Sequence, residues 1–244
     1  MEIKTGILEK LKNVKMVLTD YDGTLTHRWE LSIDGLEAVR RLERNGIIVS
    51  FVSSNNLATM AFLAMYYGIS GYVISESGAV IAKDLRIVWA VDRSNFPRKK
   101  IEEIMISLGF ESILNDVKYV DLTFFRTEKS RNVTTEEIIK RLKNEVGDVE
   151  VYDSGYAVHI LPKGVSKSNA FFKLLDIMNL KNEEVVVIGD GANDLDLFEV
   201  AEISAAPSNA ADVLKERAKI LLDYPDGKGF AQLADLILKV KRLI

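Results

Sequence analysis

The stretch from residue 14 to residue 24 reads VKMVLTDYDGT, and it decides how the rest of the chain is interpreted. Its first half is short, apolar and bounded by charged residues, a pattern typical of a buried β-strand. The strand is expected to end at Asp20, and the segment Asp20-Tyr21-Asp22-Gly23-Thr24 follows as a turn. The segment therefore predicts two carboxylates, those of Asp20 and Asp22, at the carboxyl end of a buried strand.

Predicted strands and helices alternate around this segment. Apolar runs at 47–52, 72–75 and 185–188 are typical of further buried strands, and the patterns at 32–45 and 57–67 predict helices. Such alternation with short joints predicts a parallel sheet with helices on both faces. Ligands of open parallel sheets bind at the carboxyl ends of the strands, so polar residues that follow these strands are candidates for one shared site.

The rhythm changes in the middle of the chain, where strand patterns occur in pairs beside two helices. Asp153-Ser154-Gly155, between two strand-like runs, is a hairpin signal. We therefore expect an α/β fold, with a Rossmann-like parallel-sheet core carrying helices on both faces and an inserted α+β cap domain. The expected core comprises residues 1–83 and 160–244, and the expected cap comprises residues 84–159.

Composition narrows the chemistry. The 244 residues include no cysteine and two histidines, which excludes disulfides, cysteine nucleophiles, zinc–thiolate sites and histidine-rich metal centres. A metal must then be held mainly by oxygen, which indicates Mg²⁺ or a similar hard ion. The formal charge of −4 gives no electrostatic footprint for nucleic acid. Because no apolar run is long enough for a membrane span and no signal peptide is evident, we expect a cytoplasmic protein without a membrane partner. Its oligomeric state is not encoded in any pattern that we recognise.

The two carboxylates after the first strand suit phosphoryl chemistry. A carboxylate such as that of Asp20 can attack phosphorus directly and give an acyl phosphate that water later hydrolyses. Asp22 can protonate the leaving oxygen and then activate the water. Gly23 permits a sharp turn, which the Thr24 hydroxyl can hold. Considered alone, the segment is equally consistent with a solvated surface turn.

Two further clusters can hold a phosphate. Ser53, Ser54 and Asn55 follow the strand at 47–52 and offer hydroxyl and backbone N–H groups, although a helix N-cap is the simpler explanation. Lys167 is expected in the first turn of a helix, where a cation is unfavourable unless it faces an anion. A solvated Lys167 is the alternative, and Lys163 competes for the same role.

The last cluster, Gly189-Asp190-Gly191-Ala192-Asn193-Asp194, follows the strand at 185–188. Its two acids and one carboxamide supply the oxygen ligands that Mg²⁺ prefers. An acidic loop that caps a helix is the alternative. Taken together, however, the four clusters provide acids for a metal, a cation and hydroxyls for a phosphate at one sheet edge. Stabilising charge on a transferring phosphoryl group requires that combination.

These four clusters resemble, in order, the four motifs of the haloacid dehalogenase-like superfamily: DYDGT (20–24), Ser53 after an apolar strand, Lys167, and GDGAND (189–194). The resemblance covers nearly the whole chain. Glu76-Ser77-Gly78-Ala79 is similar to a signature of the Cof-type branch, subfamily IIB.

The position and composition of the insertion are also similar to that branch, whose α+β cap is of type C2. Within the branch, the chain length, the modest cap and DSGYAVHI (153–160) are most similar to the archaeal phosphoglycolate phosphatases.

The resemblance implies roles for individual residues. Asp20 would be the nucleophile and a Mg²⁺ ligand, and Asp22 the general acid/base that also gives its backbone carbonyl to the metal. Asp190 would bind Mg²⁺ directly, and Asp194 directly or through water. The candidates for phosphate or substrate binding are Thr24, Ser53, Ser54, Asn55, Lys167 and Asn193.

We therefore expect a magnesium-dependent phosphomonoester hydrolase that acts on a small phosphorylated metabolite through an aspartyl-phosphate. The resemblance suggests phosphoglycolate as the substrate and a place in carbohydrate metabolism. Alternatives within the superfamily are a sugar-phosphate phosphatase and a phosphomutase; the alternative from another class is a phosphoaspartate signalling domain.

Several further residues have no assigned catalytic role. His27 follows the first motif closely enough to border the site as part of a flap, and His159, on a predicted strand, is expected to be packed. The cap residues considered as substrate contacts, with core packing as the alternative for the aromatic ones, are Tyr119, Phe124, Phe125 and Arg126.

Overall fold

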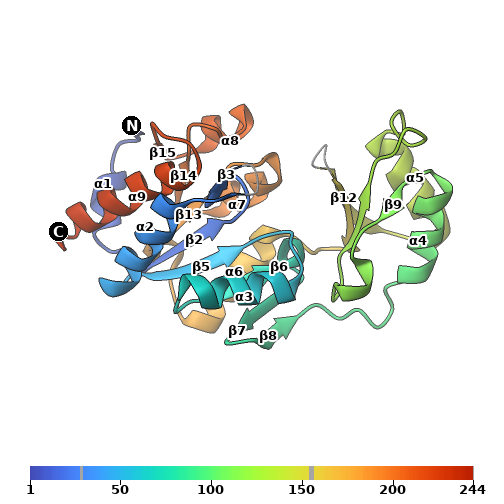
Figure 1. Cartoon of the computed structure of the whole chain (residues 1–244), viewed down its shortest axis with the longest axis horizontal. Helices are drawn as coiled ribbons and strands as arrows, with labels where there is room; N and C mark the ends of the chain where they lie inside the picture. Colours follow the sequence, from blue (N-terminus) through green and yellow to red (C-terminus); the bar gives the residue numbers. More distant parts are fainter. Residues whose placement is uncertain (28–29, 154–156, 244) are drawn as a thin grey trace.

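The computed structural model describes residues 1–27, 30–153 and 157–243. Part of the predicted 153–155 turn, and the first residue of the strand expected after it, lie outside these ranges. Figure 1 shows a larger body that contains both termini and a smaller body that carries helices α4 (Arg98–Ser107) and α5 (Thr135–Val146). The described chain thus forms a main sheet and a separate second sheet.

The main sheet contains nine strands within the described residues. In spatial order they are β1 (Glu2–Ile3), β15 (Ile220–Leu221), β14 (Ile203–Ala206), β13 (Val185–Ile188), β2 (Met16–Asp20), β5 (Ile48–Val52), β6 (Val73–Ser75), β7 (Val80–Lys83) and β8 (Arg86–Ala90). Neighbouring strands from β15 to β6 run parallel, and β1, β7 and β8 join antiparallel at the two edges.

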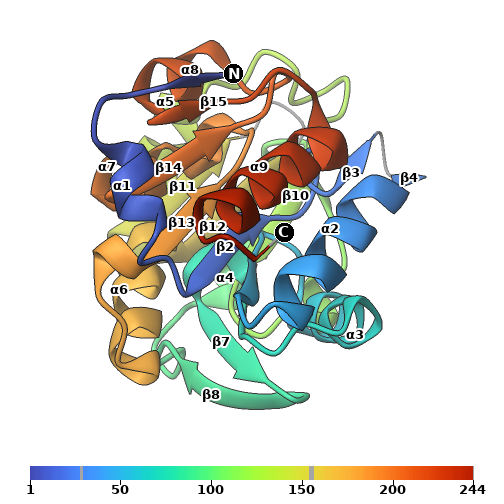
Figure 2. The ribbon, with the colours of Figure 1, turned by 90° about the vertical axis from the view of Figure 1, so that its left-hand side faces the viewer.

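The central strands of this sheet are buried on both faces. Consecutive side chains of one strand point to opposite faces, and every residue of β2 and β13 is buried. Val17 of β2 packs into one apolar cluster, whereas its neighbours Met16 and Leu18 pack into another. Figure 2 shows α2, α3 and α9 on one side of the central strands and α6 and α7 on the other. The helices of the larger body are α1 (Ile7–Leu11), α2 (Ile33–Arg44), α3 (Leu57–Tyr67), α6 (Lys167–Met178), α7 (Leu195–Val200), α8 (Asp212–Arg217) and α9 (Asp226–Val240).

The smaller body is an antiparallel sheet covered by two helices. Its strands, in spatial order, are β11 (Val149–Asp153), β12 (Ala157–Pro162), β10 (Leu122–Phe125) and β9 (Glu111–Ser112). Ile101 and Met105 of α4, Ile138 of α5, and Leu122 and Phe124 of β10 belong to one buried cluster. The expected α/β class with an added α+β part is therefore confirmed.

The junctions between the two bodies differ from the expected 84 and 160. β8 (Arg86–Ala90) pairs with β7 in the main sheet, and its Trp89 packs against the main core. β12 continues to Pro162 because it pairs with β11 along its length. We therefore propose a cap that spans about residues 91–162, because it begins after β8, which pairs in the main sheet, and ends with β12, which pairs in the second sheet.

Local sequence accounts for most element boundaries. Ser32 caps α2 by accepting a hydrogen bond from the backbone N–H of Gly35, and Thr134 forms a capping box with Glu137 at α5. Gly68, in the left-handed conformation, ends α3. The short pair β3 (Thr26–His27) and β4 (Glu30–Leu31) was not expected from the sequence. No helix in the described part of the chain is both long and apolar enough to cross a membrane.

Candidate active site

Three adjacent strands carry the first, second and fourth predicted motifs at their carboxyl ends. β13, β2 and β5 are neighbours in the sheet, and they lead into Gly189-Asp190, Asp20 and Ser53 respectively. Because all three strands run parallel, these residues emerge at one edge. The sheet order, rather than proximity in sequence, brings them together.

The turn after β2 fits against the fourth motif. Gly23 has a φ of +81°, and a Cβ at this position would collide with the carboxylate of Asp190. The Thr24 hydroxyl donates a hydrogen bond to Asp190 Oδ1 at 2.9 Å. Thr24 is fully buried, so its hydroxyl positions this carboxylate. Asn209 donates to the Gly23 carbonyl at 2.8 Å and so supports the same turn.

Lys167 lies at the first position of α6, as expected, and reaches into the site. Its ammonium donates to Asp20 Oδ1 at 2.8 Å and also contacts Asp194, and its side chain is 3% exposed. Burial opposes the charge of Lys167, but Asp194 and Asp20 outweigh burial and raise its pKa above the usual value. Lys163, the competing candidate, is 69% exposed and pairs with Asp148 on the surface.

Three carboxylates converge beside this lysine. Ligand oxygens of Asp20, Asp190 and Asp194 lie within 4.8 Å of one another. Burial, followed by the charge of Asp194, raises the pKa of Asp190 from 3.8 to about 7 and raises that of Asp20 well above 3.8. One ammonium does not balance three carboxylates, and a divalent cation would offset the remaining charge. An all-oxygen donor set of this kind fits Mg²⁺.

The second motif supports Asp22. The Asn55 side-chain amide donates to Asp22 Oδ2 at 2.6 Å, and the Ser53 hydroxyl accepts from the Asn55 backbone N–H at 3.1 Å. The N-cap of α3 is Asn56, so Ser53, Ser54 and Asn55 precede the cap. Burial raises the pKa of Asp22 above 3.8. A carboxyl with a raised pKa holds its proton more readily and is suited to act as a general acid.

Two adjoining cavities open over these groups. One is lined by Asp20, Asp190 and Ser53, and it extends to the cap residues Tyr152 and Asp153. The other has a volume of about 470 Å³ and reaches from Asp22 and Lys167 under the cap. Both cavities are lined by Asp22, Ser54, Tyr152 and Asn193. Asn193, an exposed member of the fourth motif, therefore faces the space shared by the core and the cap.

The cap residues considered from sequence have different surroundings. Phe125 lines the cavity of about 470 Å³, and Phe124 is buried in the cap core. Tyr119 lies against the guanidinium of Arg93, and Arg126 pairs with Asp153 at 2.5 Å. His27 lies beside Asp226, with Nδ1 and Oδ2 2.9 Å apart, and is 57% exposed.

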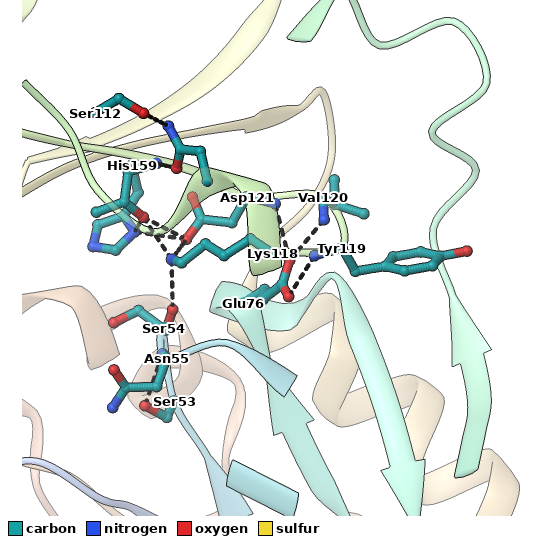
Figure 3. A network of polar contacts seen from close by, with 12 residues as sticks. Ser53, Ser54, Asn55, Glu76, Ser112, Lys118, Tyr119, Val120, Asp121 and His159 are labelled. Atoms are coloured by element: carbon teal, nitrogen blue, oxygen red, sulfur yellow. Dashed lines mark hydrogen bonds and ion pairs between the residues drawn. The ribbon is translucent and has the colours of Figure 1, made fainter. Parts of the chain in front are cut away.

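Glu76 is a functional candidate that sequence reasoning noted but did not interpret. Its fully buried carboxylate accepts hydrogen bonds from the backbone N–H groups of Tyr119, Val120 and Asp121, at 2.8, 2.7 and 3.0 Å (Figure 3). Glu76 itself has a φ of +52°, an uncommon conformation outside glycine. This carboxylate fixes a cap loop to the core, and the contact spans more than forty residues of sequence.

Comparison with known proteins agrees with this architecture. The family model of haloacid dehalogenase-like hydrolases matches residues 17–114 and 110–233. The chain therefore belongs to the haloacid dehalogenase-like hydrolase family, and the resemblance inferred from its motifs is confirmed.

Similar proteins support the expected activity class. The chain is 33% identical over 232 residues to a phosphoglycolate phosphatase of Metallosphaera sedula, covering 92% of this chain and 99% of that protein. It is 33% identical to a phosphoglycolate phosphatase of Picrophilus torridus, covering 88% and 86%. A solved structure of a Thermoplasma acidophilum protein superposes with a TM-score of 0.81 at 26% identity, covering 95% and 99% of the two chains. These similarities confirm the expectation that the chain is a phosphatase.

Proposed function

We propose that this protein is a magnesium-dependent phosphomonoester hydrolase that forms an aspartyl-phosphate on Asp20, with phosphoglycolate as the leading candidate substrate. The observation that carries this proposal is the convergence of Asp20, Lys167, Asp190 and Asp194 at the carboxyl edge of three parallel strands. The names of similar proteins suggest the substrate.

Asp20 is proposed as the nucleophile. One of its carboxylate oxygens contacts Lys167. The ammonium holds the carboxylate in place and offsets the repulsion between it and an anionic phosphate. An oxygen of Asp20 attacks phosphorus, the ester P–O bond breaks, and the departing alkoxide takes a proton from Asp22. Asp22 is suited to this step because burial raises its pKa, which favours the protonated carboxyl, and because Asn55 orients it.

The second step returns the enzyme to its starting state. Asp22, now ionised, removes a proton from a water molecule that attacks the phosphorus of the aspartyl-phosphate. The bond between phosphorus and the Asp20 oxygen then breaks, and inorganic phosphate leaves. Ser53, Ser54, Asn55 and Asn193 are proposed to bind phosphoryl or substrate oxygens, and Thr24 to position Asp190.

Asp20, Asp190 and Asp194 are proposed to hold Mg²⁺, together with the backbone carbonyl of Asp22. When bound, the ion supplies positive charge that stabilises the phosphoryl oxygens during transfer. The excess of carboxylates over cations in the site motivates this assignment.

The test is a screen of phosphorylated metabolites with purified protein in Mg²⁺ and in EDTA, with inorganic phosphate as the readout. We expect release of phosphate that requires Mg²⁺ and is fastest with phosphoglycolate. High activity on sugar phosphates alongside none on phosphoglycolate would reject that substrate. An isomerised product without free phosphate would indicate a phosphomutase, and a long-lived phosphoprotein without turnover would indicate a signalling domain.

A further inference from the structure

The cap wall of the cavity of about 470 Å³ contains a buried polar cluster, formed by Lys118, Asp121, Thr123 and His159. Figure 3 labels its three ionisable members, Lys118, Asp121 and His159. The Lys118 ammonium donates to Asp121 Oδ2 and to Thr123 Oγ1, both at 2.5 Å. His159 Nδ1 lies 2.8 Å from the same Asp121 oxygen. Sequence reasoning expected His159 to be packed, and the structure adds that it lines a cavity.

The side chains of this cluster lie at different depths from the cavity. Asp121 is fully buried, whereas Lys118 and His159 line the cavity. The carboxylate therefore lies behind the two basic side chains, and the cavity meets the lysine and the imidazole. Because the one carboxylate of Asp121 faces two basic side chains, the side of the cluster that lines the cavity can carry positive charge.

The hydrogen bond to Asp121 also fixes the imidazole of His159. A carboxylate accepts hydrogen bonds, so Nδ1 carries the proton and donates it. Nε2 then lies on the opposite side of the ring, and no hydrogen-bond partner for it is found in residues 1–27, 30–153 and 157–243. Since His159 lines the cavity, this nitrogen is placed to bind a ligand there.

The rest of this wall favours an anion. Among the described residues that line the cavity from the cap, none is acidic; they are Ile113, Leu114, Lys118, Thr123, Phe125, Tyr152, Ala157 and His159. Apolar neighbours lower the local dielectric constant and strengthen the attraction between a basic side chain and an anionic group.

The hydrogen bond that joins this cluster to the second motif favours a short substrate. The Lys118 ammonium also donates to the Ser54 carbonyl at 3.2 Å, and Ser54 lines both cavities beside Ser53. The basic cluster is thus joined directly to the second motif. Glu76, by holding the 119–121 backbone, fixes this spacing between cap and core.

We propose that His159 and Lys118 bind the carboxylate of the substrate's alcohol portion, so that the substrate class is the phosphate ester of a short hydroxy acid. This inference rests on the proposed phosphatase function. In the complex with substrate the imidazole carries a proton on each nitrogen, so that Nδ1–H donates to Asp121 and Nε2–H donates to the substrate carboxylate. Lys118 supplies further positive charge, and Asp121 positions both side chains from behind.

The test compares two esters of similar size, phosphoglycolate and ethyl phosphate, which lacks the carboxylate. His159→Asn retains an amide in place of Nδ1 for Asp121 but removes the nitrogen that faces the cavity. We expect a loss of about 10- to 100-fold in kcat/KM for phosphoglycolate, the size of a charge-assisted hydrogen bond, expressed mainly as a higher KM. Activity on ethyl phosphate should stay near that of the unaltered protein, and this activity also reports correct folding.

Two further variants sharpen the result. His159→Gln places an amide near the position of Nε2, so it should retain more activity on phosphoglycolate than His159→Asn. Lys100→Met, which removes an exposed cation from α4, should change neither ester. Equal losses on both esters in His159→Asn, or no loss on either, would overturn the proposal while leaving the phosphatase function standing. Absence of phosphate release from any ester by the unaltered protein with Mg²⁺ would overturn the phosphatase function itself.

Discussion

Replacing Asp20 by asparagine removes one charge from the site and almost no volume. The asparagine retains an oxygen in the place of Oδ1, which accepts from Lys167 at 2.8 Å in the present structure. The amide is not a nucleophile toward phosphorus, so we expect kcat to fall by at least about 10⁴-fold. The fold should persist, because Asp20 ends a strand whose other residues are fully buried and unchanged.

The same substitution should stabilise the metal-free protein. The pKa of Asp20 is raised by burial first and by Asp194 second, so its ionised form destabilises the fold at neutral pH even beside Lys167. We expect the free energy of unfolding to rise by the size of a typical single-substitution effect, about 1 kcal/mol. For a chain of this size that increase corresponds to a Tm higher by about 2–4 °C.

The assay pairs phosphate release in Mg²⁺ with thermal unfolding in EDTA at pH 8. Asp34→Asn is the matched control, because Asp34 is an exposed acid in the first turn of α2, away from the cluster. Near-normal turnover in Asp20→Asn would refute the covalent mechanism. A lower Tm in EDTA would refute the claim that excess negative charge destabilises the site.

Three further predictions concern the surroundings of the nucleophile. Burial and Asp194 raise the pKa of Asp190 to about 7, so the free energy of unfolding in EDTA should fall as pH rises from about 4 to about 7. Mg²⁺ should restore that free energy at pH 8. A denaturant titration at each pH measures the profile, and a flat profile would contradict the prediction. Glu76→Gln should raise KM by about 10-fold, because the neutral amide holds the cap loop less well. Steady-state kinetics measures this, with Glu128→Gln, at an exposed cap acid, as the control. An unchanged KM in Glu76→Gln would show that the contact is unimportant. Asn55→Ala should lower kcat/KM by about 5-fold, because Asp22 loses its 2.6 Å hydrogen bond; unaltered kinetics would show that the cavity alone orients Asp22.

The local sequence determines where the main strands end and which residues follow them. The apolar run before Asp20 is bounded by charge, and β2 ends at Asp20 as expected. The run at 185–188 and the helix at 57–67 also match their predicted bounds. These features were predictable because burial and capping act over a few residues. The parallel order of strands then implies that Asp20, Asp190 and Ser53 share an edge, which the structure confirms.

Tertiary structure decided which of several plausible groups belong to the site. The sequence offered Lys163 and Lys167 with similar local contexts, and only the packing of α6 buries Lys167 against Asp20, 147 positions away. Tertiary packing also places the Thr24 hydroxyl where it donates a hydrogen bond to Asp190, 166 positions away. The cap cluster, with Lys118 and His159 facing a cavity, arises because β10 pairs with β12 and Glu76 holds the loop before β10. Sequence patterns report the preferences of near neighbours, whereas these contacts depend on how distant segments pack, which no local preference encodes.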